Sequence, residues 1–255
     1  MNLWSIVLPA AAGAVGVAAW GAVYPTSQLF GPALCRTTRP SAIALTFDDG
    51  PNPAATPELL ALLERHRARA TFFLVGRFAR ACPELVGEIS ARGHLIGNHT
   101  ETHRNLALLS TSRIQQEILR CQESIVTATN GSAPTWMRPP FGFRGPQLWT
   151  AVRRAGLRGV VQWSLTCHDW KPQPPSRLIA RLAKIADSAP VRAADSETEA
   201  IHGGEMVLLH DGDFRELGGD RRHVLAALEH WLPRWRDLGF EFVTVDQIAG
   251  TAPLL

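Results

Sequence analysis

The stretch TFDDGP, residues 46–51, decides both the fold and the function predicted for this chain. The residues before it, SAIAL at 41–45, form an apolar run that predicts a buried strand, and Gly50-Pro51 is a turn signal that ends it. Two adjacent carboxylates therefore lie where a core strand gives way to a loop. Because neighbouring strand residues point to opposite sides, Asp49 can bind a metal while Asp48 stays free as a base. An Asx turn in an ordinary strand-to-helix loop is the alternative interpretation.

Apolar runs and helical patterns alternate along the rest of the chain. Further strands are predicted at 70–75, 95–98, 157–163, 206–210 and 240–245, with a short strand and loop at 136–141. Helices are predicted at 57–66, 79–92, 111–129, 146–155, 176–186 and 221–236. Strands that alternate with helices in this way predict an α/β fold with a parallel sheet.

The composition suits one large domain with a sizeable core, because 45% of the 255 residues are hydrophobic. The net charge of +3 comes without a Lys/Arg run, so no nucleic-acid partner is predicted. No feature of the sequence indicates a protein partner. The four cysteines are widely spaced without a Cys-x-x-Cys pair, which favours free, mostly buried thiols over a zinc site or a disulfide framework: Cys35, Cys82, Cys121 and Cys167.

The first 35 residues contain no charged side chain. Residues 3–23 are mostly apolar and long enough to span a membrane, and Trp4, Trp20 and Tyr24 lie near the ends of this segment. A buried Ala/Gly helix and a cleaved signal peptide are the alternatives, although a basic leading region and a clear Ala-x-Ala boundary are missing. The predicted organisation is a hydrophobic anchor or signal segment at 1–24, a linker at 25–40 and a catalytic domain at 41–250.

The stretch HTETH places His99 and His103 four residues apart. On a helical turn these two side chains share one face, and with Asp49 they form a two-His, one-carboxylate set with positions left open for water or substrate. A solvated polar turn is the alternative. A zinc protease would need His-Glu-x-x-His, but Thr100 follows the first histidine here, so that class lacks its general base.

Three further strand ends carry polar groups. In RPPF, Arg138 is suited to steady a carboxylate, and the prolines stiffen its loop. In WSLTCHDW, Asp169 can orient a histidine and Trp170 offers a platform for a sugar ring. In MVLLHDG, His210 ends an apolar strand, where barrel-like folds place their active sites. A proline-rich turn with a surface arginine and a satisfied edge histidine are the alternatives.

Cys167 and His168 are neighbours, which raises the possibility of a thiol nucleophile. Adjacent strand side chains point apart, so an inert cysteine is expected instead.

The joint occurrence of these five motifs resembles the polysaccharide deacetylase family, which shares the NodB homology domain and forms carbohydrate esterase family 4. The resemblance covers about residues 41–248. It implies a distorted (β/α) barrel of about seven parallel strands, here preceded by an N-terminal hydrophobic helix. It further implies Asp48 as catalytic base, steadied by Arg138, and Asp49, His99 and His103 as ligands of a divalent metal.

The same resemblance assigns the substrate side of the site. It implies that the Phe141 backbone N–H helps to bind the oxyanion, that Trp170 forms a groove wall and that Leu208 contacts the substrate. It implies His210 as general acid, with Asp169 as its partner. The implied reaction is removal of N-acetyl groups from a glycan that contains N-acetylglucosamine, such as peptidoglycan or a chitin-like polymer, with release of acetate.

Zinc suits the implied ligands, and cobalt, nickel or manganese fit a similar geometry. A same-fold amidase or esterase acting on a small amide or O-acetyl xylan and an inactive glycan-binding module are the alternatives. The expected location is the cell envelope, with the domain outside the cytoplasm, either membrane-anchored through residues 3–23 or secreted.

Three departures from the family pattern stand out. Thr166 replaces an Asp common in the fourth motif, and Arg104 replaces a common Pro. Residues 187–204 form a polar insertion expected to be a mobile surface loop that can rim the substrate groove.

Overall fold

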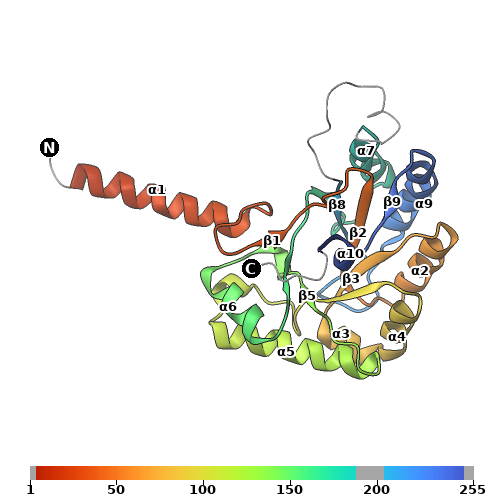
Figure 1. Cartoon of the computed structure of the whole chain (residues 1–255), viewed down its shortest axis with the longest axis horizontal. Helices are drawn as coiled ribbons and strands as arrows, with labels where there is room; N and C mark the ends of the chain where they lie inside the picture. The colour runs from red at the N-terminus through yellow and green to blue at the C-terminus, as the bar shows by residue number, and fades with distance from the viewer. Residues whose placement is uncertain (1–3, 188–203, 250–255) are drawn as a thin grey trace.

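Strand β2 (Ala42–Gly50) is an interior strand of the sheet and is buried along its whole length. It pairs in parallel with β3 (Ala70–Leu74) on one side and β8 (Met206–His210) on the other (Figure 1). A strand covered on both faces needs a nearly continuous apolar sequence, and the run before Asp48 provides it. The computed structural model describes residues 4–187 and 204–249, with side chains from residue 12 to 248. The expected insertion between Asp187 and Gly204 therefore lies outside the described residues.

The sheet follows the order β1-β6-β5-β4-β3-β2-β8-β7, and every pairing along this path is parallel. Its other strands are β1 (Ala33–Leu34), β4 (Leu95–Asn98), β5 (Trp136–Met137), β6 (Gly159–Val161) and β7 (Leu165–Thr166), and β9 (Glu241–Phe242) pairs with the start of β2. The result is a distorted (β/α) barrel, which confirms the predicted fold class. Two of its strands, β1 and β7, span only two residues each and were not predicted, since no long apolar run marks them.

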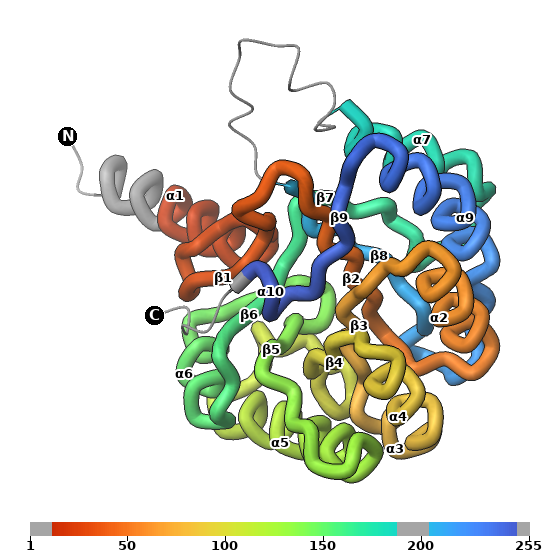
Figure 2. Tube along the Cα trace, turned by 45° about the vertical axis from the view of Figure 1, so that its right-hand side comes forward, coloured from red at the N-terminus to blue at the C-terminus, as the bar shows by residue number. Residues whose placement is uncertain are grey.

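Helices surround this sheet on the outside (Figure 2). They are α2 (Thr56–Arg65), α3 (Gly76–Ala81), α4 (Pro83–Ala91), α5 (Thr111–Ala128), α6 (Pro146–Arg154), α7 (Pro175–Ala186), α9 (Arg222–Asp237) and α10 (Val245–Ala249). The prediction of a single helix at 79–92 is wrong, because this segment is divided between α3 and α4. Pro83 lacks an N–H group and suits the first position of a helix, so it starts α4 instead of continuing α3.

The main hydrophobic core lies between the sheet and these helices. Alternate residues of β2, Ile43, Leu45 and Phe47, pack there with Leu63 of α2 and Trp235 of α9, and all five are fully buried. Each such side chain contributes about 1.5–3 kcal/mol through burial. The core thereby fixes β2, and with it the position of the two carboxylates at its end.

Helix α1 (Trp4–Val23) extends away from the sheet in Figure 1. Val15, Val17 and Val23 are more than half exposed. Among the helices of the described residues, none combines the length and apolarity needed to cross a membrane. The end of α1 is tied to the domain by buried Arg144, whose guanidinium donates to the Tyr24 carbonyl at 2.7 Å.

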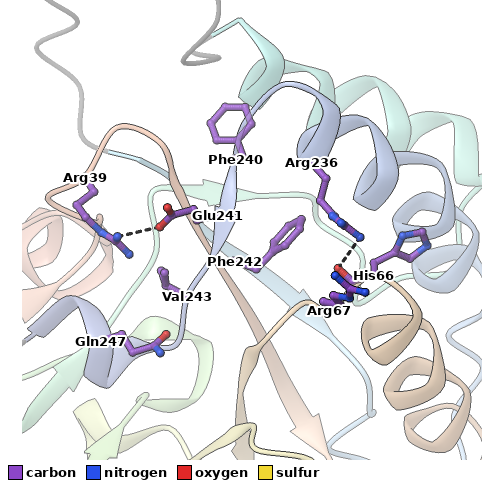
Figure 3. A pocket seen from close by; sticks show the side chains of 9 residues that line it. All are labelled: Arg39, His66, Arg67, Arg236, Phe240, Glu241, Phe242, Val243 and Gln247. Carbon is purple, nitrogen blue, oxygen red and sulfur yellow. Dashed lines mark hydrogen bonds and ion pairs between the residues drawn. The ribbon is translucent and has the colours of Figure 1, made fainter.

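A hollow of about 770 Å³ lies where β9 pairs with the first residues of β2, far along that strand from its two carboxylates (Figure 3). Arg236 donates to the carbonyl of His66 at 3.4 Å, at the C-terminus of α2, and Arg39 pairs with Glu241 at 2.8 Å. A cation is favourable at a helix C-terminus. These arginines therefore stabilise the ends of secondary-structure elements, and the hollow is part of the scaffold.

Candidate active site

A β-bulge at the end of β2 aims both carboxylates at one site. The pairing of β2 with β3 shifts register between Asp48 and Gly50, and Asp49 takes a left-handed φ of 70°. Neighbouring strand residues ordinarily point to opposite sides, but a bulge redirects a side chain. Both line one cavity of about 450 Å³, together with residues from six other segments: His99, His103, Phe141, Gly142, Phe143, Trp163, Trp170, Lys171, Leu208, His210, Asp213, Phe214, Arg215 and Arg221.

Asp49, His99 and His103 come together in this cavity as a potential metal site. Oδ1 of Asp49 lies 3.5 Å from Nε2 of His99 and 3.1 Å from Nε2 of His103, and the three ligand atoms lie within 4.8 Å of one another. This Oδ1 atom is buried without a hydrogen-bond partner among the described residues. Two imidazole nitrogens and one carboxylate oxygen around an unsatisfied buried atom suit a divalent cation such as zinc.

The protonation states also suit metal binding. Burial by itself would raise the pKa of Asp49, but His103 and His99 lower that pKa overall, so the carboxylate stays ionised. Burial lowers the pKa of His103 below its ordinary value, so this imidazole is neutral at neutral pH. Metal ligation requires an ionised carboxylate and neutral imidazoles.

The loop that carries the two histidines is not the helical turn that their spacing predicted. Thr100 and His103 have left-handed φ values of 68° and 56°. The loop is held by hydrogen bonds from the Thr100 N–H to Asn98 Oδ1 at 2.8 Å and from the His103 N–H to Thr100 Oγ1 at 3.1 Å. Such strained backbone persists only where the surroundings fix it, and it clusters at functional sites.

Asp48 is held by Arg138. The guanidinium Nη1 donates to Asp48 Oδ1 at 2.8 Å and to Thr46 Oγ1 at 2.7 Å, and Nη2 donates to the Gln162 carbonyl at 2.8 Å. Arg138 is fully buried, and its guanidinium lies 4.4 Å from the centre of the Phe73 ring. With this many partners Arg138 has one orientation, which fixes the carboxylate it binds.

His210 lies opposite Asp48 in the register of β2 with β8. Its Nδ1–H donates to Asp169 Oδ1 at 3.0 Å, and its backbone N–H donates to Asp169 Oδ2 at 2.7 Å. Burial favours the neutral imidazole, but the charge and hydrogen bond of Asp169 raise the pKa of His210 to about 9 overall. The imidazole is therefore protonated at neutral pH and able to donate a proton.

The remaining predicted residues lie at the mouth of the cavity. Phe141 and Trp170 are partly exposed and Leu208 is buried. Phe141 has a left-handed φ of 60°, as do several other residues of the site. Cys167 is fully buried, and burial raises the pKa of its thiol, which disfavours the reactive thiolate. All four cysteines are free.

Several residues that the motifs did not single out also build the site. Gln162 holds Arg138 through its carbonyl. Asp213 and Phe214 lie in a turn beside His103, and Arg221 at the start of α9 pairs with Asp213. Asp211 is buried behind Gly50, where its carboxylate accepts a hydrogen bond from Thr56 Oγ1. Asp211 to Phe214 directly follow the strand end at His210, and only that adjacency in sequence could have indicated them.

Gly50 leaves room for the Asp211 carboxylate. A Cβ atom added at Gly50 would lie 2.5 Å from both carboxylate oxygens. We expect Gly50→Ala to lower the free energy of unfolding by about 1–3 kcal/mol, the cost of overpacking a well-filled site. Urea denaturation measures this change. The matched control is Gly87→Ala in α4, where the nearest atom to the new Cβ lies at 3.4 Å and Ala favours the helix. A Gly50→Ala protein as stable as the control would contradict the packing argument.

Comparison with known proteins places this geometry in a family. The family model described as polysaccharide deacetylase matches residues 36–160. A chitooligosaccharide deacetylase from Bradyrhizobium sp. is 32% identical over 213 residues, which cover 81% of this chain and 90% of that protein. A peptidoglycan-N-acetylglucosamine deacetylase from Bacillus cereus is 33% identical over 207 residues, which cover 81% of this chain and 87% of that protein.

A solved structure gives the same result. A peptidoglycan N-acetylglucosamine deacetylase matches with a TM-score of 0.68 and 31% identity, covering 85% of this chain and 91% of the other. The family model, the relatives and the fold agree, and the chain therefore belongs to the polysaccharide deacetylase family.

Proposed function

We propose that this chain is a metal-dependent hydrolase that removes N-acetyl groups from a glycan containing N-acetylglucosamine and releases acetate. One observation carries the proposal. Asp48 and His210 lie opposite each other on adjacent strands, and the metal-binding set Asp49, His99 and His103 lines the same cavity. Hydrolysis of an amide needs a base for the water and an acid for the leaving amine, and this arrangement provides both.

Each step of the proposed hydrolysis is assigned to a particular residue of the chain. Asp48, oriented by Arg138, accepts a proton from the attacking water, whose oxygen bonds to the acetamide carbon. The backbone N–H of Phe141 donates to the developing oxyanion, and a donor of this kind is worth about 3–4 kcal/mol. His210, charged beside Asp169, gives its proton to the leaving nitrogen as the C–N bond breaks, so that acetate and a free amine result. A divalent cation held by the three ligands would supply Lewis-acid polarisation of the amide.

The mouth of the cavity supports a sugar substrate. Trp170, Trp163 and Phe141 present aromatic rings there, which suit the apolar face of a pyranose, and Leu208 lines the wall. The named activities of the relatives, on peptidoglycan and on chitooligosaccharides, support the same substrate class. We propose an extracytoplasmic role on that basis. The proposed organisation is a hydrophobic anchor or signal segment at 1–24, a linker at 25–40 and the catalytic domain at 41–250. Zinc is the proposed metal.

Acetate release from peptidoglycan and from chitooligosaccharides, measured side by side with and without a chelator, tests the proposal. We expect release from at least one substrate, its loss on chelation and its recovery when Zn²⁺ or Co²⁺ is added back. Chelation should abolish turnover because it removes the cation that Asp49, His99 and His103 would hold, and these three residues supply no other catalytic group in its place. Turnover that survives complete removal of the metal, or hydrolysis limited to a small cyclic amide or O-acetyl xylan, would contradict it.

A further inference from the structure

The two histidines of the metal site are held in different ways. The Nδ1–H of His99 donates to the Arg138 carbonyl at 2.8 Å, which fixes the tautomer and the orientation of the ring with Nε2 toward Asp49. Metal-binding histidines almost always make such a bond with their second nitrogen. Nδ1 of His103 is buried and has no hydrogen-bond partner within the described part of the chain. Among the described residues, contacts other than a hydrogen bond to Nδ1 therefore orient the His103 ring.

Contacts with aromatic rings orient the His103 imidazole. Phe214 stacks on His103 with ring centres 4.1 Å apart and planes 15° from parallel. The edge contacts come from Phe141 at 4.7 Å and 78° and from His99 at 4.9 Å and 63°. Phe214 stacks on one face of the imidazole, and the rings of Phe141 and His99 lie steeply inclined to it. Together these contacts restrict the imidazole to one plane. Aromatic pairs at these separations are favourable beyond the area they bury.

Phe214 is itself fixed by a tight turn. Asp213 accepts two hydrogen bonds from the Arg215 guanidinium, at 2.9 and 2.7 Å, and one from the Arg215 N–H at 3.0 Å. Arg221 donates to the Gly212 carbonyl at 2.8 Å on the inner side of the turn. Arg77 of α3 donates to the Phe214 carbonyl and also donates its own N–H to the Glu101 carbonyl at 3.1 Å, so the turn and the histidine loop share one support.

The geometry points to Phe214 as a positioning residue for the metal ligand His103, one that replaces by stacking the hydrogen bond its Nδ1 lacks. The inference rests on the proposed function, because it takes Asp49, His99 and His103 as the metal ligands. Phe214 holds the ring so that Nε2 faces Oδ1 of Asp49 at 3.1 Å. Losing the stack frees the imidazole to rotate, and the entropy of fixing it again opposes metal binding.

Metal affinity is the direct test. We expect Phe214→Leu, which keeps apolar bulk but removes the ring, to raise the Zn²⁺ dissociation constant of the full chain about fivefold to tenfold. Competition with a chromogenic chelator measures this constant. Phe214→Tyr, which keeps the ring, should stay within about twofold of the wild type. Saturating Zn²⁺ should restore most of the activity that the Phe214→Leu protein loses at limiting Zn²⁺, because the ligand atoms themselves are unchanged.

Leu217→Ala is the matched control, since Leu217 lies exposed in the same loop and should leave both metal affinity and stability unchanged. Thermal unfolding of the metal-free proteins separates a loss of affinity from a loss of fold. Phe214→Leu and Phe214→Tyr with the same Zn²⁺ affinity as the wild type would overturn the inference and leave the proposed function intact. A wild-type chain that binds no divalent metal would instead overturn the proposed function.

Discussion

Asp48→Asn is expected to lower kcat for acetate release by about 10²–10⁴-fold, the usual contribution of a general base. An amide has nearly the shape of a carboxylate but cannot accept the proton of the attacking water. The amide oxygen of the variant can still accept a hydrogen bond from Arg138, which now binds Asp48 Oδ1 at 2.8 Å, so the local structure should persist. KM should change little, because Asp48 acts on the water and not on the sugar.

Asp49→Asn is the matched variant, since it makes the same chemical change one residue along the chain. It should weaken Zn²⁺ binding strongly, because an amide oxygen is a poorer ligand than the ionised carboxylate beside His99 and His103. Asp48→Asn should retain the metal. Chelator competition and acetate assays at saturating Zn²⁺ separate the two effects. If Asp48→Asn loses metal and Asp49→Asn loses only turnover, the two assigned roles are exchanged and our assignment is wrong.

Much of the fold and of the candidate site was predictable because local signals act independently of the rest of the chain. The apolar run before Asp48 and the Gly50-Pro51 turn predict a buried strand with carboxylates at its end, and the structure has both. In parallel strands the carboxyl ends meet at one edge, so residues as distant in sequence as Asp48 and His210 become neighbours. That topological rule gathers the candidate residues without any knowledge of side-chain contacts.

What the sequence did not predict depends on long-range packing. The bulge at Asp49 belongs to the pairing of β2 with β3, two segments that are separate in the sequence, whereas β2 pairs with β8 without a shift as far as Asp48. The left-handed residues of the histidine loop persist because Asn98 and Thr100 hold them, which no helical periodicity reveals. Phe214 belongs to no motif, and its contact with His103 exists only once a turn after β8 meets the loop after β4.

The acid side of the site gives the second large expected effect. We expect Asp169→Asn to lower kcat about 100-fold or more at pH 8 and to move the alkaline limb of the kcat profile toward lower pH. In the wild type, Asp169 outweighs burial and raises the pKa of His210 to about 9, so the acid form is lost only as the pH rises through that value. Without the carboxylate charge, burial favours neutral His210 and the pKa falls.

The sign of this shift separates the proposed role of His210 from the opposite one. An acid that must be protonated loses activity on the alkaline side, whereas a base that must be neutral would lose it on the acid side. Profiles of kcat for the wild type and Asp169→Asn, each at saturating Zn²⁺, decide between them. His223→Gln is a suitable control, because the His223 ring bonds to the backbone carbonyl of Asp169, at 2.9 Å, and its replacement leaves the carboxylate charge unchanged. An alkaline limb that stays in place when Asp169 is neutralised, while the control behaves like the wild type, would show that the His210–Asp169 pair does not supply the proton to the leaving amine.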